Sequence, residues 1–165
     1  MGARSNYNQT ERIIRPITSK EAKVKAAKFC AYQDRTQQEV RDRLYKMNLY
    51  PDEVEIIISE LLEEGFINEE RYAKSYARGK FYQNKWGKNK ILNGLKQKGL
   101  TEYCIKKALS EIDESEYEKL ILKLIYKKQK QLNEKDKFIR NNKIAMFLYS
   151  KGFEKDIIWK ILNDS

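Results

Sequence analysis

The sequence predicts an all-α protein built from three tandem three-helix repeats in an elongated, curved array. The main observation is a pattern of six positions that occurs three times with identical internal spacing, at residues 40–58, 91–109 and 144–162. Self-similarity at a fixed period is the sequence signature of repeat architectures. The second observation is that the alternation of apolar and polar residues typical of strands is not sustained anywhere in the chain.

Each copy of the pattern predicts one helix, a tight turn and a second helix. The first two positions, such as Ile91 and Leu95, are four residues apart and therefore share one helix face. The third position holds Asn48, Gly99 or Gly152, residues that tolerate the left-handed backbone that closes a helix. The last two positions are again four residues apart, on the second helix. The three copies are Val40, Leu44, Asn48, Leu49, Val54 and Ile58; Ile91, Leu95, Gly99, Leu100, Ile105 and Leu109; and Ile144, Leu148, Gly152, Phe153, Ile158 and Leu162.

A further helix is predicted before each copy, at about residues 21–32, 69–82 and 116–131, which completes three helices in every repeat. Local signals support these helices. Thr36 and Glu39 have the spacing of a capping box at the start of one of them.

The chain divides into four segments in this interpretation. Residues 1–18 are polar and lack a helical period, so we expect a disordered N-terminal tail. The three repeats then occupy residues 19–66, 67–112 and 113–165.

The composition excludes several classes of function. The chain has no histidine, which is the commonest general base and metal ligand, and Cys30 and Cys104 lack the spacing of a zinc site. Gly87 and Lys88 lack the upstream glycine and the following Ser or Thr of a phosphate-binding loop. We therefore expect no catalytic residues, no metal and no cofactor, and the protein is not expected to be an enzyme.

The cellular setting follows from similar observations. No apolar run approaches the roughly 18 residues that span a bilayer, and residues 1–18 contain no apolar leader segment. The two cysteines are expected to be small buried apolar residues rather than a disulfide pair. We expect a cytoplasmic monomer with no membrane partner.

The net charge of +10 belongs entirely to the second repeat. Residues 71–107 hold eleven basic residues and one acidic residue, whereas the rest of the chain is balanced. Aromatic residues interleave with these cations, and Tyr82 and Trp86 are candidate stacking platforms for single-stranded nucleic acid. Tyr72 and Tyr76, four residues apart beside alanines, fit the core stripe of an amphipathic helix better. The candidate binding surface consists of Arg71, Lys74, Arg78, Lys80, Lys85, Lys88, Lys90, Lys96 and Lys98.

An acidic block precedes the basic one. Residues 52–70 hold eight acidic residues and no Lys or Arg. Complementary charges steer encounters and fix the register of a complex, so we interpret the adjoining blocks as a surface for an oriented partner.

Three local strings resemble the RecX family, regulators of the RecA recombinase. They are residues 27–44, which include the capping box, residues 65–73 after the acidic helix, and residues 86–99 from Trp86-Gly87 to the turn glycine. The resemblance covers about residues 20–112 and continues more weakly through the third repeat.

The resemblance implies both a fold and a function. The implied fold is three tandem three-helix repeats. The implied function is binding to the RecA filament on single-stranded DNA, in its helical groove, with inhibition of strand exchange and ATP hydrolysis in DNA repair, recombination and the SOS response. The family has no catalytic residues to transfer, and its groove contacts are basic surfaces.

Two interpretations of the function remain at the level of the sequence. In the first, the chain modulates RecA through protein contacts. In the second, it is a helical module that binds single-stranded nucleic acid without a dedicated RecA contact. The acidic block favours the first interpretation, because a DNA-binding module gains nothing from eight acids beside its basic face.

The shared third position of the pattern generates a first testable prediction. Gly99 is expected to have a positive φ, where a β-branched side chain is strained. Gly99→Val is therefore expected to lower the free energy of unfolding by about 1 kcal/mol or more, measured by urea denaturation. An unchanged unfolding midpoint would contradict the turn assignment.

Overall fold

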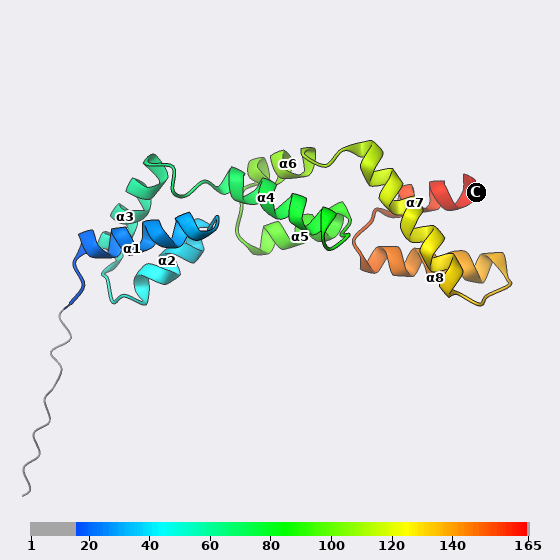
Figure 1. The fold of residues 1–165 in the computed structure, drawn as a ribbon, viewed down its shortest axis with the longest axis horizontal. Helices are drawn as coiled ribbons and strands as arrows, with labels where there is room; N and C mark the ends of the chain where they lie inside the picture. The colour runs from blue at the N-terminus through cyan, green and yellow to red at the C-terminus, as the bar shows by residue number, and fades with distance from the viewer. Residues whose placement is uncertain (1–15, 165) are drawn as a thin grey trace, which may run out of the picture.

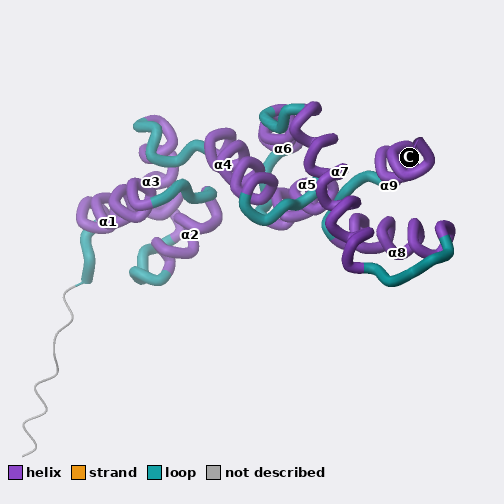
Figure 2. Tube along the Cα trace, turned by 45° about the vertical axis from the view of Figure 1, so that its right-hand side comes forward, coloured by secondary structure: helices purple, strands orange, loops and turns teal. Residues whose placement is uncertain are grey.

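The computed structural model describes residues 16–164, and this part of the chain is all-helical, with nine α-helices and no strand. The predicted all-α fold of tandem three-helix repeats is confirmed, and the helices form three consecutive groups along one long axis (Figures 1 and 2). The helices are α1 (Ser19–Tyr32), α2 (Gln37–Tyr45) and α3 (Pro51–Glu63); α4 (Glu69–Tyr82), α5 (Lys88–Gln97) and α6 (Glu102–Ser110); and α7 (Glu114–Gln131), α8 (Lys137–Ser150) and α9 (Lys155–Asp164).

The helix starts follow from side-chain caps. Thr36 and Glu39 form the predicted capping box before α2, with both of its hydrogen bonds present. Helices α1 and α7 each begin two residues earlier than predicted, because Thr18 and Asp113 accept hydrogen bonds from the backbone at their first turns. Residues 1–15 of the predicted tail lie outside the described residues, while Ile17 packs against the core of the first repeat.

The three predicted turns have the expected backbone. Asn48, Gly99 and Gly152 have φ values of 60°, 75° and 91°. Lys85 also has a positive φ, 59°, in the loop between α4 and α5, which was not predicted from the sequence. Its ammonium group donates a hydrogen bond to the carbonyl of Tyr82, which closes this loop locally.

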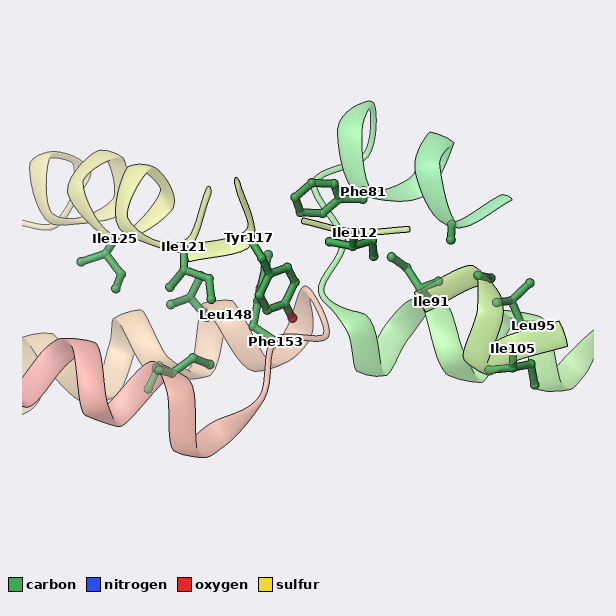
Figure 3. Close-up of a cluster of buried hydrophobic side chains, with 14 of the residues drawn as sticks. Phe81, Ile91, Leu95, Ile105, Ile112, Tyr117, Ile121, Ile125, Leu148 and Phe153 are labelled. Carbon is green, nitrogen blue, oxygen red and sulfur yellow. The ribbon is translucent and has the colours of Figure 1, made fainter. Parts of the chain in front are cut away.

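The described residues form two hydrophobic cores rather than three. The first repeat has its own core, in which Val40, Leu44 and Leu61 are fully buried. The second and third repeats share a continuous core (Figure 3). The ring of Tyr117 connects its two halves, since its centroid lies 5.9 Å from that of Phe81 and 5.4 Å from that of Phe153. Of the two cysteines, Cys30 is buried in the first core and Cys104 is half-buried against the second.

The backbones of the second and third repeats are in direct contact. The amide of Gly87 donates to the carbonyl of Lys151 at 2.7 Å, and the amide of Asn89 donates to that of Gly152 at 2.9 Å. A Cβ on Gly87 would lie 2.3 Å from the carbonyl carbon of Gly152, so only glycine fits there. Beside this contact, the buried hydroxyl of Tyr117 accepts a hydrogen bond from the amide of Lys88.

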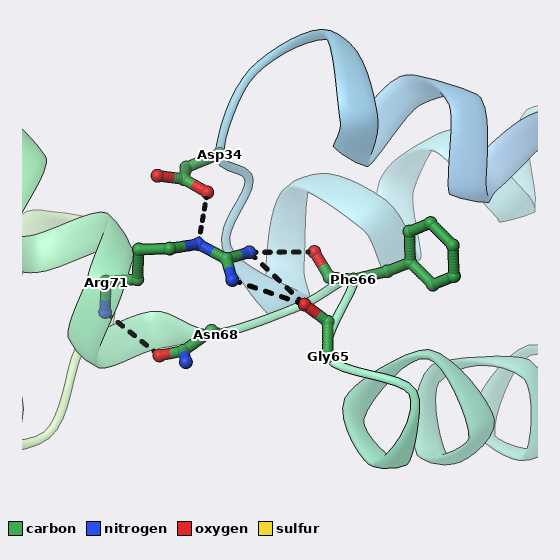
Figure 4. Close-up of polar contacts among 5 residues, drawn as sticks. All are labelled: Asp34, Gly65, Phe66, Asn68 and Arg71. Carbon is green, nitrogen blue, oxygen red and sulfur yellow. Dashed lines mark hydrogen bonds and ion pairs between the residues drawn. The ribbon is translucent and has the colours of Figure 1, made fainter.

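The joint between the first and second repeats is polar instead. The Nε of Arg71 donates to Asp34 at 2.7 Å, and its two terminal nitrogens donate to the carbonyls of Gly65 and Phe66 at 3.3 Å (Figure 4). These carbonyls follow the C-terminal end of α3, where a cation is favourable. The side chain is 47% exposed, so this joint is open to solvent.

The contact between Gly87 and Gly152 generates a second prediction. Gly87→Ala is expected to lower the free energy of unfolding by about 3 kcal/mol, because the new methyl group cannot be accommodated without separating two backbones. Guanidinium denaturation followed by circular dichroism provides the measurement.

Gly79→Ala is the matched control. Gly79 lies inside α4, and a Cβ there would have no neighbour within 4 Å. The alanine is expected to stabilise the chain by up to about 1 kcal/mol through its helix propensity. Equal effects of the two substitutions would contradict the close approach at the joint.

Candidate protein and nucleic-acid interface

The nine candidate cations lie on α4, on α5 and in the connections beside these helices, and the fold pairs five of them with acids. Arg71 pairs with Asp34, and Lys98 lies 3.6 Å from Glu39 of the first repeat. The other three pairs are Lys74 with Glu70 and Glu111, Arg78 with Glu111, and Lys88 with Glu114. The hydrogen-bonded contact with Glu70 is the larger cause that raises the pKa of Lys74. The segregation of charge seen along the sequence is therefore reduced in space.

The acidic block is also engaged within its own repeat. Lys23 of α1 lies 3.0 Å from Glu60 and 2.6 Å from Glu64, and Arg41 of α2 lies 2.7 Å from Glu55. These pairs connect α3 to its two neighbours. Glu55, Glu60 and Glu64 therefore have ion-pair partners within the first repeat, and the interpretation of the block as a surface for an oriented partner stays a prediction.

Four of the candidate cations have no ion pair among the described residues, and two of them surround Trp86. The Nζ atoms of Lys80 and Lys90 lie 4.7 and 4.6 Å from the centroid of its aromatic ring. The ammonium of Lys151 donates to the carbonyl of Asn84 in the same loop. Burial, together with the charge of Lys90, lowers the pKa of Lys151. The other two unpaired cations are Lys85 and Lys96.

We call Lys80, Lys90, Lys151 and the half-buried Trp86 the joint cluster. It places two cations at one indole and a third, Lys151, near Lys90 at the contact of the second and third repeats. Cation–π attraction holds lysines near an indole face, and the same geometry can receive a phosphate beside a stacked base. The sequence predicted Lys80, Lys90 and Trp86, whereas Lys151 comes from the next repeat.

Tyr82, the other candidate stacking residue, is 45% exposed. Its hydroxyl donates a hydrogen bond to Glu116 on α7, which raises the pKa of Tyr82. Tyr72 and Tyr76 are half-buried against the second core with their ring centroids 6.3 Å apart, and burial raises the pKa of Tyr72 to about 12. The packing of these two rings agrees with the core assignment made from their spacing.

A groove of about 220 Å³ extends this surface onto the third repeat. Its lining brings together three lysines, Lys85, Lys119 and Lys123, around Tyr82. Sequence reasoning missed Lys119 and Lys123, because they belong to another repeat. The available signal was the run of residues 119–143, which holds nine basic residues and two acidic ones. We call these three lysines the groove lysines.

Neither a metal site nor a membrane-spanning helix occurs in the described residues. No group of three or more His, Cys, Asp or Glu within residues 16–164 could hold a metal ion. None of the helices over the same residues has the length and apolar character needed to cross a bilayer. The arrangement can bind anionic groups through cations and flat groups through exposed aromatic rings.

The fold and this surface define a class of protein, an all-helical tandem-repeat protein with cations gathered around a joint between repeats. Family models of the first, second and third three-helix domains of RecX match residues 22–61, 68–109 and 115–162 in that order. The chain belongs to the RecX family.

Named relatives agree with this membership. The regulatory protein RecX of Streptococcus uberis is 34% identical over 131 residues, which are 79% of this chain and 50% of that protein. The protein of the same name from Bacillus mycoides is 31% identical, over 83% of this chain and 51% of that protein. The chain thus spans about half the length of these relatives. The Clostridium tetani protein is 29% identical over 99% of this chain and 76% of its own length.

Solved structures share the arrangement of the repeats. The crystal structure of RecX from Lactobacillus salivarius superimposes with a TM-score of 0.82 and 27% identity, over 88% of this chain and 95% of that one. A second crystal structure, of a regulatory protein RecX, gives a TM-score of 0.75 and 25% identity, over 89% of this chain and 74% of that one.

The polar joint between the first two repeats generates a third prediction. Arg71→Gln is expected to lower the free energy of unfolding by about 1 kcal/mol at low salt, because it removes one exposed ion pair and the bonds to two carbonyls. The difference in stability between Arg71→Gln and wild type is expected to shrink in about 0.5 M NaCl, because salt screens interactions between exposed charges. Thermal unfolding at two salt concentrations provides the measurement.

Lys96→Gln is the control for this prediction. It removes the same charge from an exposed lysine that has no ion pair among the described residues. Its unfolding temperature is expected to stay near that of wild type at both salt concentrations. A loss of stability as large as that of Arg71→Gln would show that net charge, not the joint, is responsible.

Proposed function

We propose that this chain binds the RecA filament on single-stranded DNA and inhibits the recombinase and ATPase activities of RecA, and so regulates recombination and repair. The observation that carries the proposal is the match of all three repeats, in order, to the three-helix domains of RecX. The relatives are named as regulatory proteins, and a regulator needs a binding surface rather than catalytic groups.

The contact surface in this proposal contains the joint cluster and the groove lysines. Lys85, Lys119 and Lys123 are exposed and free of ion pairs with the described residues, so they can meet an anionic partner without breaking an ion pair of the fold. Lys88 is a poorer candidate, because its ammonium group pairs with Glu114 and its amide donates to Tyr117. We therefore assign binding to the unpaired lysines first.

A charge-matched pair of variants tests this proposal. Reversal of the groove lysines in Lys85→Glu/Lys119→Glu/Lys123→Glu is expected to raise the concentration for half-inhibition of the RecA ATPase about tenfold or more, since both phosphates and acidic protein groups would be repelled. The control is Lys20→Glu/Lys25→Glu/Lys28→Glu on α1, where three exposed lysines are reversed at a distance from the groove.

The control is expected to inhibit nearly as well as wild type at the same ionic strength, and both variants are expected to keep wild-type helicity by circular dichroism. Equal losses in the two triple variants would mean that only the net charge matters. Full inhibition by the groove variant would remove this surface from the proposal.

The second candidate function is a module that binds single-stranded nucleic acid without a dedicated RecA contact. The joint cluster favours it, because an indole with two lysines beside it suits a stacked base and its phosphate. Affinity for a free oligo-dT strand, measured by fluorescence anisotropy beside the ATPase assay, separates the two. A RecA-directed regulator is expected to inhibit at concentrations where free DNA is not bound.

A further inference from the structure

The two joints between repeats share one position of the repeat. The residue just before the six-position pattern is Glu39 in the first repeat and Lys90 in the second. Glu39 pairs with Lys98, next to the turn glycine Gly99 of the following repeat. Lys90 packs on Gly152, the turn glycine of the third repeat. A Cβ added to Gly152 would lie only 2.3 Å from the Cβ of Lys90.

Each joint also contains an ion pair to the first turn of the next repeat, although Asp34 lies six residues before the six-position pattern and Lys88 only three. The connection after α1 places Asp34 against Arg71 in the first turn of α4. The start of α5 places Lys88 against Glu114 in the first turn of α7. Each repeat therefore has a leading face, made by the end of its first helix and the start of its second. This face meets a receiving face of the next repeat, made by the first turn of its first helix and its glycine turn.

The third repeat carries a leading face of the same kind. Asn142 and Lys143 occupy the positions of Asn89 and Lys90, counted from the six-position pattern. Both line a groove of about 500 Å³ between the end of α7 and the start of α8, and no segment within residues 16–164 covers this groove. Its full lining is Lys128, Leu132, Phe138, Ile139, Asn142, Lys143, Met146 and Phe147.

This face is unusually apolar for an exposed surface. The side chain of Phe138 is 76% exposed and that of Met146 is 65% exposed. Helical repeat arrays need a polar outer face where nothing packs, and exposed apolar patches mark interaction sites. Methionine side chains also adapt their shape to different partners.

Charge identifies the kind of partner. At the first joint an acidic leading face meets a basic receiving face. At the second joint Lys88 pairs with Glu114, while Lys90 and Lys151 lie near each other with like charges. The third leading face is basic, with Lys128 and Lys143 in the groove and a net charge of +7 over residues 119–143, and Lys143 lies 3.6 Å from Glu134. Charge complementarity favours an occupant that carries acids in the first turn of a helix, as α7 does at the second joint.

A second copy of this chain meets that requirement only in part. The receiving face of its first repeat has one acid, Glu21, in the first turn of α1, but it also has Lys20 there and Lys46 beside the turn at Asn48. Docking two copies head to tail would place these lysines against Lys128 and Lys143. Like charges at an interface oppose such an assembly.

We propose that the leading face of the third repeat binds an acidic amphipathic helix of a partner protein. Apolar side chains of that helix fill the groove beside Phe138 and Met146, and acids in its first turn pair with Lys143 and Lys128. The proposal is independent of the RecA-directed function, because it rests on the repeat register and on the charge of this face alone.

The test uses two synthetic peptides and the full chain with ¹³C-labelled methionine methyl groups. One peptide is an amphipathic helix with leucines at i and i+4 and glutamates in its first turn, and the other replaces every glutamate with lysine. The acidic peptide is expected to shift the methyl signal of Met146 and to leave that of Met47, in the first core, unchanged. The basic peptide is expected to bind at least tenfold more weakly.

Variants of the protein make the test specific to this face. Phe138→Ser and Lys143→Glu are each expected to weaken binding of the acidic peptide about tenfold. The matched control is Leu122→Ser, which removes an apolar side chain that is 52% exposed on α7 and does not line the groove. Circular dichroism verifies that the helicity of each variant is intact.

Several results would overturn the proposal. One is equal binding of both peptides, and another is undiminished binding of the acidic peptide by Phe138→Ser. A third is a shift of the Met146 signal by oligo-dT but not by the acidic peptide, which would assign the face to nucleic acid. Light scattering gives the last result: a molar mass that rises with concentration in the wild type but not in Phe138→Ser would assign the face to a second copy of the chain.

Discussion

The close approach of two backbones at Gly87 and Gly152 is the constraint on which the rest of the structure depends. Two amide-to-carbonyl bonds and the buried ring of Tyr117 fix the third repeat on the second, and they allow one core to continue through both. The same contact brings Lys151 to Lys90 and Trp86, and it brings α7 beside Tyr82. The candidate binding surface is therefore a product of the joint, not of either repeat alone.

The two joints differ in physical character, and this difference bears on binding. The first depends on exposed charges such as Arg71, whose contribution salt screens, while the second depends on burial and backbone contact, which salt affects little. A partner that spans all three repeats therefore meets a rigid pair and a first repeat whose orientation is set by weaker interactions. This arrangement suits the proposed binding to a helical filament, whose curvature the chain would follow.

Much of the fold could be predicted from the sequence, because helix periodicity, caps and turn glycines are local signals. The six-position pattern placed the turns at Asn48, Gly99 and Gly152, and all three have the predicted backbone. The candidate site was less predictable, because ion pairing is a property of space. Arg71 and Lys98 pair with acids more than 30 positions away along the chain, and Lys119 and Lys123 reach the site from another repeat. The merging of two repeats into one core also has no local signature.

The separate core of the first repeat has a consequence for how the chain opens. A contiguous core exchanges its amide hydrogens only when it opens as a unit, whereas a region connected by solvent-exposed polar contacts can open alone at a lower free energy. The chain thus contains two cooperative units of unequal size, one formed by α1 to α3 and the other by α4 to α9. Amide protons of Val40 and Leu44 then report the smaller unit, and those of Ile91 and Ile121 report the larger one. Unfolding of the whole chain is then expected to proceed in two steps, and substitutions at Gly87 and Gly99 act on the larger unit.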